Sequence, residues 1–196
     1  MKTLLILGGD KIGRSALGAL TTSCNLMIAI DNSTSLRRIL RLIVKRRIRV
    51  FLLIKMITCE LIRKNPKSSI KGYPSIKNNS DLLRVIDEFK PQRICLFRAG
   101  LVINREVIER RIPLMNIHCA KVPEYGGLGS IDRAIKDRAV EQNATLHQVT
   151  TTIDRGKVFD IESFRLDLSK NYCFNENIAY EAGLKLLKRL LQDELH

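Results

Sequence analysis

Residues 2–31 read KTLLILGGDKIGRSALGALTTSCNLMIAID, and this stretch decides the fold. Its first apolar run, residues 2–7, ends in Gly8-Gly9-Asp10, and residues 12–20 then place apolar side chains at helical spacing. A second apolar run, residues 26–30, stops at Asp31. A strand, a glycine turn, a helix and another strand are how a parallel sheet with crossover helices begins. The stretch therefore predicts an α/β fold with a mostly parallel sheet flanked by helices.

The same alternation continues to the end of the chain. Apolar or alternating runs predict strands at residues 93–97, 114–117 and 145–150, and helical spacing predicts helices at 81–89, 104–111, 130–137 and 176–191. Ser80 is a suitable N-cap for the first of these helices, and Pro91 follows its end. With 196 residues and no internal repeat, the chain is predicted to form a single domain over residues 1–196.

The net charge of +14 is concentrated in one segment. Residues 34–71 hold twelve Lys or Arg and one acid, Glu60, so this segment carries +11. Apolar residues at helical spacing alternate with these basic ones over residues 36–45 and again over 48–62. The pattern predicts a basic amphipathic helical hairpin, inserted into an otherwise near-neutral domain at about residues 34–64.

Composition excludes several classes of protein. The apolar run at residues 50–54 is far shorter than the roughly 20 residues that cross a bilayer, and the N-terminal run has no small-residue cleavage site after it. The five cysteines are an odd number and form no Cys-x-x-Cys pair, which argues against a disulfide framework or a structural zinc site. We therefore expect reduced thiols in a cytoplasmic protein.

Residues 114–160 carry the side chains with the most chemistry. Asn116 and His118 are two residues apart at the end of an apolar strand, so their side chains share one face. The carboxyl ends of parallel strands are where such folds place their sites. Asp154 follows in a later loop, before Gly156. Each residue also has a structural interpretation: Asn116 as a turn residue, His118 as a core histidine and Asp154 as a turn cap.

The order of these motifs resembles the folate-dependent formyltransferase family. The family pattern is an Asn-x-His strand end, a Pro-x-Tyr/Phe-x-Gly loop, a helix, a Thr-x-His-x-Val strand and an Ile-Asp-x-Gly loop. Here the pieces are residues 116–118, 123–127, 130–137, 145–149 and 153–156, in that order. The resemblance covers nearly the whole chain except the basic insertion, and it implies a Rossmann-like fold of the formyltransferase type.

The resemblance implies transfer of a formyl group from 10-formyltetrahydrofolate, as cosubstrate, to a primary amine, without a metal. Asn116 and His118 would donate hydrogen bonds to the formyl oxygen, where negative charge develops during attack. Asp154 would orient the histidine or a water and accept the proton of the amine, which favours a raised carboxylate pKa. His147, in the centre of a predicted strand, is expected either to be structural or to support the catalytic residues without touching substrate.

The resemblance also implies which residues bind the two substrates. Folate contacts fall on Phe97, Arg98, Ala99, Gly100, Leu101 and Ile153, and acceptor contacts fall on Gly8, Gly9, Lys11, Tyr125 and Gly126. Many family members carry a basic residue where this chain has Gly126. The Gly8-Gly9 loop also lacks a Gly-x-Gly-x-x-Gly, which argues against a dinucleotide site.

Several acceptors and partners remain open from the sequence. We favour a small, anionic amine as acceptor, namely the amino group of a nucleotide-linked amino sugar. The N-terminal loop lacks the Ser-Gly-Asn sequence that is typical of glycinamide ribonucleotide enzymes. No tRNA-binding domain is expected after the last helix. Glycinamide ribonucleotide and methionyl-tRNA are the alternatives. Another is a non-catalytic, formyltransferase-like binding protein recruited through residues 34–64 to a membrane surface or nucleic acid, and a homodimer is also left open.

Overall fold

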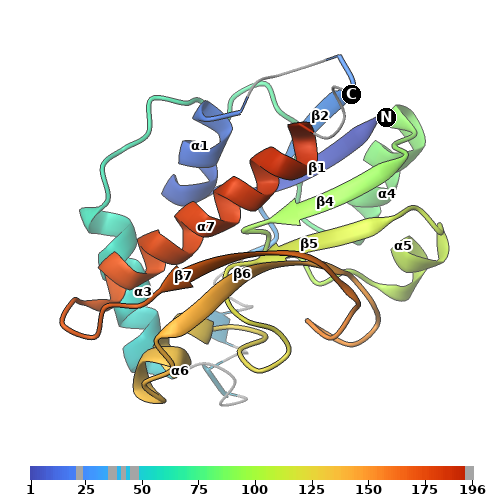
Figure 1. The fold of residues 1–196 in the computed structure, drawn as a ribbon. Coiled ribbons are helices and arrows are strands. Elements are labelled where there is room, and N and C mark those ends of the chain that lie inside the picture. Colours follow the sequence, from blue (N-terminus) through green and yellow to red (C-terminus); the bar gives the residue numbers. More distant parts are fainter. Residues whose placement is uncertain (21–23, 35–38, 41–42, 45–48, 193–196) are drawn as a thin grey trace.

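A seven-stranded sheet forms the centre of the protein in the computed structural model (Figure 1), which describes residues 1–20, 24–34, 39–40, 43–44 and 49–192. The strand order is β3-β2-β1-β4-β5-β6-β7. All pairs from β3 to β5 are parallel, whereas β6 and β7 run antiparallel to their neighbours. The strands are β1 (Thr3–Gly8), β2 (Leu26–Asp31), β3 (Ser75–Ile76), β4 (Arg93–Phe97), β5 (Leu114–His118), β6 (Glu141–Gln148) and β7 (Val158–Arg165). The predicted α/β fold with a mostly parallel sheet is confirmed.

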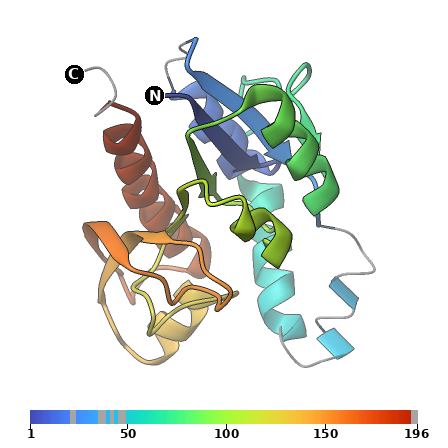
Figure 2. The same ribbon diagram turned by 90° about the vertical axis from the view of Figure 1, so that its right-hand side faces the viewer.

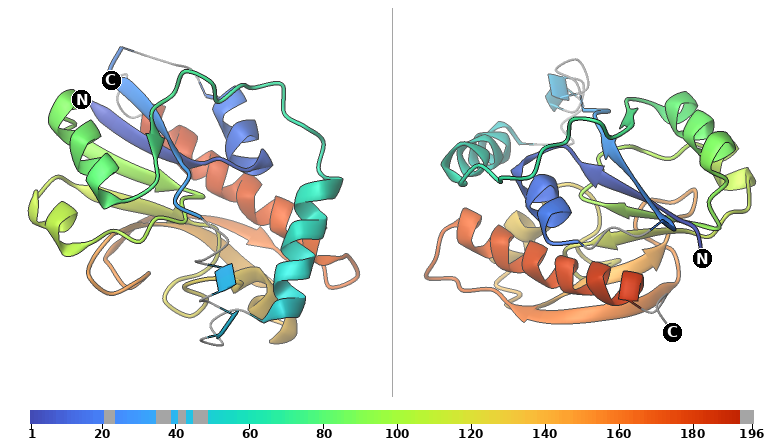
Figure 3. Two further views of the ribbon diagram at one scale, coloured as in Figure 1. Left: turned by 180° about the vertical axis from the view of Figure 1, so that it is seen from behind. Right: turned by 90° about the horizontal axis from the view of Figure 1, so that it is seen from above.

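Helices cover both faces of this sheet, as the view from above shows (Figure 3). On one face, α1 (Lys11–Gly18) and the long α7 (Tyr172–Gln192) enclose a core that includes Leu5, Leu7, Phe97 and Leu186. On the other face, α4 (Asn79–Phe89) and α5 (Arg105–Glu109) enclose a core that includes Leu4, Ile6, Leu82 and Ile94. Because successive residues of a strand point to opposite faces, the fully buried β1 contributes to both cores.

Asparagine and aspartate side chains fix the starts of three helices. The carboxylate of Asp10 accepts the Gly13 N–H at the start of α1, and Asn104 caps α5 in the same way. The expected N-cap of α4, Ser80, is wrong. Asn78 caps this helix because its side-chain oxygen accepts the Asp81 N–H, so α4 begins at Asn79.

Two strands were not predicted from the sequence. β3 has only two residues, too few to show a period. β7 is an edge strand whose residues are mostly exposed or half-buried, and it includes Asp160 and Glu162, which are residue types that strands disfavour. Its pairing with β6 nevertheless closes one side of the sheet and gives α7 a surface to cover.

The basic insertion yields one described helix, α3 (Val50–Ile62). This agrees with the second half of the predicted hairpin, whereas most of the first half lies outside the described residues. No helix in the described ranges is long and apolar enough to cross a membrane.

A disulfide joins α3 to α7, which corrects the expectation of five reduced thiols. Cys59 on α3 and Cys173 in the first turn of α7 are 114 residues apart in sequence, but their Cα atoms are 5.3 Å apart. The chain fold brings the two thiols together, and sequence spacing gives no sign of it. Cys24, Cys95 and Cys119 are free, and the last two are buried.

Candidate active site

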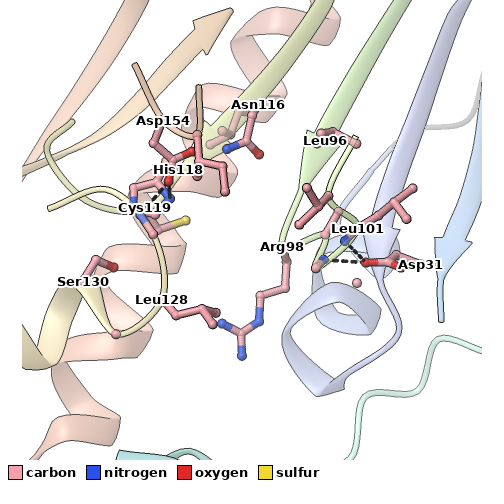
Figure 4. Close-up of a pocket in the computed structure, with 18 of the residues that line it drawn as sticks. Asp31, Leu96, Arg98, Leu101, Asn116, His118, Cys119, Leu128, Ser130 and Asp154 are labelled. Atoms are coloured by element: carbon pink, nitrogen blue, oxygen red, sulfur yellow. Dashed lines mark hydrogen bonds and ion pairs between the residues drawn. The ribbon is translucent and has the colours of Figure 1, made fainter. Parts of the chain in front are cut away.

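The candidate site lies in a large cavity at the carboxyl ends of β1, β4 and β5 (Figure 4). Its volume is about 1160 Å³, and residues from both halves of the sheet, from the loop around Asp154 and from α7 line it. Cavities for drug-sized ligands measure about 300–1,000 Å³, so this one has room for two substrates together.

The three predicted catalytic residues converge on one wall of this cavity. Asn116 and His118 point from the end of β5 to the same side, and Asp154 faces them from the loop after β6. His118 Nδ1 lies 3.6 Å from one carboxylate oxygen of Asp154. The Gly127 N–H donates to that same oxygen at 2.6 Å, which ties the loop after β5 to the Asp154 loop.

His147, which was expected to have a structural or supporting role, completes this cluster. The β5–β6 register places it directly opposite Asn116. Its Nδ1 donates to the Gln148 carbonyl oxygen, which leaves Nε2 to accept a hydrogen bond from Asn116 Nδ2 at 3.1 Å. The same nitrogen lies 3.4 Å from Asp154 Oδ1. His147 is thus buried, and it contacts two of the three predicted catalytic side chains.

The backbone that carries Asp154 has an unusual conformation. Asp154 has a φ of +51°, a left-handed value that Asp tolerates better than most residues. A Cβ on Gly156 would lie 1.9 Å from the Gln148 carbonyl oxygen, so only glycine allows the loop to return this close to β6. A Cβ on Gly126 would likewise lie 3.0 Å from the Asp154 Cβ, so a glycine there leaves the carboxylate room.

The expected rise in the pKa of Asp154 is wrong. Burial does raise the pKa of this carboxyl, but the contact with His147, the charge of His118 and the Gly127 N–H together lower it to about 2. Asp154 is therefore ionised at every pH near neutrality. A carboxylate of such low basicity is suited to stabilise a positive charge and not to hold a proton.

The environment of His118 changes the role expected for it. Burial lowers the pKa of His118 below its ordinary value of 6.5, and the nearby charge of Asp154 opposes this effect only in part. The imidazole is therefore neutral near pH 7. Its Nε2 donates to the Tyr125 carbonyl oxygen at 3.0 Å and its Nδ1 faces Asp154, so the neutral ring has no further N–H to donate.

The predicted folate-binding segment forms another wall of the cavity. Four of its members (Arg98, Ala99, Gly100, Leu101) line the cavity together with Ile153, whereas Phe97 is buried in the core behind it. Asp31, at the end of β2, holds this segment: its carboxylate accepts the N–H groups of Gly100 and of Leu101. Sequence analysis did not single out Asp31 as a site residue, although a carboxylate that ends an apolar strand is a signal that could have done so.

Only some of the predicted acceptor-binding residues line the cavity. Gly8 and Gly9 line the cavity, but Lys11, Tyr125 and Gly126 do not. The Lys11 ammonium donates to the Leu61 and Arg63 carbonyl oxygens at the end of α3, so it is already hydrogen-bonded within the protein. The Tyr125 hydroxyl donates to Asp137.

A buried ionic network lies beneath the Gly8-Gly9 loop. The Arg98 guanidinium pairs with Asp10 at 2.6 Å and with Glu176 at 3.5 Å, and it donates to the Tyr180 hydroxyl. Glu176 also pairs with Arg63, which follows α3, at 2.5 Å. Asp10, Glu176 and Tyr180 line the cavity, so this network connects its wall to the end of the basic insertion.

Within the described ranges, no group of three or more His, Cys, Asp or Glu side chains is arranged to hold a metal ion.

The comparison with protein families now identifies the chain. The family model described as "Formyl transferase" matches residues 54–167, more than half of the chain. This protein belongs to the formyl transferase family. The match begins inside α3 and includes the segments that carry Asn116, His118, His147 and Asp154.

Curated relatives of this formyl transferase include methionyl-tRNA formyltransferases. The enzyme of Sulfurihydrogenibium sp. is 24% identical over 117 residues, which are 59% of this chain and 38% of that protein. The enzyme of Natranaerobius thermophilus is 26% identical over 98 residues, which are 50% of this chain and 31% of that protein. The chain thus spans less than half the length of these curated relatives.

Solved structures share the fold over nearly all of the chain. Phosphoribosylglycinamide formyltransferase of Streptococcus pneumoniae has a TM-score of 0.63 at 16% identity, with all of both chains covered. A sugar N-formyltransferase of Shewanella sp. also has a TM-score of 0.63, at 17% identity, and covers 98% of this chain and 69% of its own. At such identities the similarity establishes the formyltransferase-like fold alone.

Proposed function

We propose that this formyl transferase moves a formyl group from 10-formyltetrahydrofolate to a primary amine. The observation that carries the proposal is the convergence of Asn116, His118 and Asp154, with His147, on a cavity large enough for both substrates. Ala99, Leu101 and Ile153 supply apolar surface to this cavity, which suits a flat pteridine ring.

In the proposed reaction, the amine nitrogen attacks the formyl carbon and the bond from that carbon to N10 of the folate breaks. The free N–H of Asn116 stabilises the negative charge on the formyl oxygen. Neutral His118 receives the proton that the amine loses and delivers it to the departing N10. Ionised Asp154 stabilises the imidazolium formed between these steps. His118 thus replaces Asp154 as the proton acceptor expected from the sequence.

The acceptor that we propose is the amino group of a nucleotide-linked amino sugar. Support comes from the start of α1, where the Asp10 carboxylate accepts the Gly13 N–H and the Glu60 carboxylate accepts the Lys11 N–H. A phosphate placed directly on this helix would meet a negative charge, which disfavours a glycinamide ribonucleotide. A diphosphate further out in the cavity mouth avoids this repulsion, and the positive charge of the protein attracts it.

An assay of formyl transfer tests both the proposed reaction and the proposed acceptor. The protein is incubated with 10-formyltetrahydrofolate and a panel of amines: nucleotide-linked amino sugars, glycinamide ribonucleotide and methionyl-tRNA. We expect transfer to the amino sugars, and we expect Asp154→Asn to lower kcat by about 10²–10³-fold. Transfer to one of the other acceptors would replace the amino sugar and keep the reaction.

The matched control is Asp160→Asn. Asp160 is a half-exposed carboxylate on β7 that pairs with Arg189, so its loss leaves the cavity unchanged. Formyl transfer by Asp154→Asn at the rate of the Asp160→Asn control would contradict the mechanism. Absence of transfer to every amine, with folate still bound, would favour the non-catalytic binding protein.

A further inference from the structure

One face of α3 exposes apolar side chains over its whole length. Six of them are between 51% and 74% exposed: Val50, Phe51, Ile54, Ile57, Leu61 and Ile62. At 100° per residue these positions fall on one arc of the helix, which only Thr58 interrupts. We call this surface the α3 outer face. Soluble proteins rarely expose so many large apolar side chains together, so we expect this surface to contact a partner.

The opposite face of α3 fixes the direction in which this outer face points. Leu52 and Cys59 are buried against the body of the protein, and Cys59 is held to α7 by the disulfide. Lys55, beside them, pairs with the buried Asp132 at 2.8 Å. These contacts attach α3 along its inner side, so it cannot rotate to bury the outer face. Figure 2 shows α3 apart from β6 and β7, and both views of Figure 3 show it at the edge of the molecule.

Positive charge accompanies this apolar face in the sequence. Residues 37–49 hold seven Lys or Arg and no acid. Among the described residues, exposed Arg49 and Lys64 flank the two ends of α3. An apolar helix face next to a cluster of basic residues is the pattern of helices that lie in the surface of anionic membranes.

We propose that the α3 outer face docks on an anionic lipid surface. The apolar side chains enter the boundary between headgroups and acyl chains, and Arg49 and Lys64 at the two ends of α3 contact lipid phosphates. With 13 residues, α3 is roughly 20 Å long, too short to span a bilayer, so it lies in the plane of the surface. This proposal does not depend on the reaction proposed above.

Charge and polarity favour lipid over the two other occupants. A second copy of this chain would carry the same net charge of +14, and the repulsion between the two copies opposes a dimer. Nucleic acid would pair with the basic residues, but a phosphate backbone offers nothing to six apolar side chains. An anionic membrane satisfies both features together.

Sedimentation of the full chain with vesicles tests the proposal. We expect binding to vesicles of phosphatidylcholine mixed with phosphatidylglycerol, and little binding to phosphatidylcholine alone or at high salt. The double variant Ile54→Ser, Ile57→Ser should lower the partition constant by about tenfold or more, because two large apolar side chains no longer leave water. Arg49→Glu with Lys64→Glu should weaken binding mainly at low salt.

The matched control is Phe159→Ser, which removes an exposed apolar side chain from β7 and should leave vesicle binding unchanged. Circular dichroism and the melting temperature of each variant establish that it is folded. Three results would overturn the proposal: no binding to anionic vesicles at low salt, equal loss in the control and the α3 variant, or a dimer in solution that the Ile54→Ser, Ile57→Ser variant dissociates. Binding of RNA in preference to anionic vesicles would also overturn it.

Discussion

The carboxyl end of β5 and the outer face of α3 follow opposite patterns of burial. At β5, polar side chains are largely buried, and each contacts another: Asn116 with His147, and both histidines with Asp154. On α3, large apolar side chains face solvent, whereas the polar Lys55 turns inward to Asp132. Both regions depart from the usual rule of apolar inside and polar outside.

The difference separates two ways of recognising function. A buried polar cluster at a cavity indicates chemistry, because burying such groups costs free energy that the fold recovers elsewhere. An exposed apolar surface indicates an unseen partner, because leaving it in water has a cost of the same kind. The disulfide and the Arg63–Glu176 ion pair connect the two regions through α7.

The largest effect expected at the β5 end comes from Asn116→Ala. This change removes the N–H that we assign to the formyl oxygen, and we expect kcat to fall by about 10²–10³-fold with a small change in KM. Steady-state kinetics with saturating folate measures it. Asn65→Ala, at an exposed position, is the control. A fall in kcat shared by both variants would refute the assignment.

Cys59→Ser tests the covalent connection between α3 and α7. Without the disulfide, a loop closed over 114 residues is freed in the unfolded chain, and the free energy of unfolding should fall by about 2–4 kcal/mol. Denaturant titration measures this loss, and a reducing agent should produce the same loss in the wild type. Cys24→Ser, at an exposed free cysteine, should change nothing. Identical unfolding midpoints with and without reductant would exclude the cross-link.

His147 is expected to position the reacting groups without touching substrate. His147→Phe removes the acceptor for Asn116, so we expect kcat to fall by about tenfold while KM stays within about twofold. His147→Gln retains a side-chain oxygen that can accept from the amide, and it should recover part of kcat. A purely structural role would instead lower the melting temperature of both variants and leave kcat in the folded fraction unchanged.

The smallest effect concerns pH. Because burial lowers the pKa of His118 below 6.5, its neutral form persists through neutral pH, and kcat/KM should be flat from about pH 8 down to 6.5. Below that, protonation removes the proton acceptor and the rate falls. The unfolded chain binds this proton more readily, so stability also falls as pH drops through 6.5. Histidine resonances followed by NMR give the pKa, and a midpoint above 6.5 would contradict this account.

The sequence predicted the parts of the fold and the site that depend on local spacing. The alternation of apolar runs predicted every parallel strand except β3 and most helices, and the i, i+2 spacing of Asn116 and His118 placed both on one face of β5. The sequence did not give what depends on tertiary proximity: the Cys59–Cys173 bond, the Asp31 contact with the 98–101 segment and the lowered pKa of Asp154. Each of these features depends on segments that are distant in sequence but close in space. No periodic pattern of residues indicates such proximity.

Asp31 also marks the place where the chain leaves the sheet for the basic segment. Its carboxylate holds the backbone of Leu101 on one side and the Ser33 N–H at 2.8 Å on the other. The residues that follow are therefore anchored at their root, and those after α3 are anchored again by the Arg63–Glu176 pair. A change of length or charge between these two anchored ends should therefore leave the wall of the cavity unchanged.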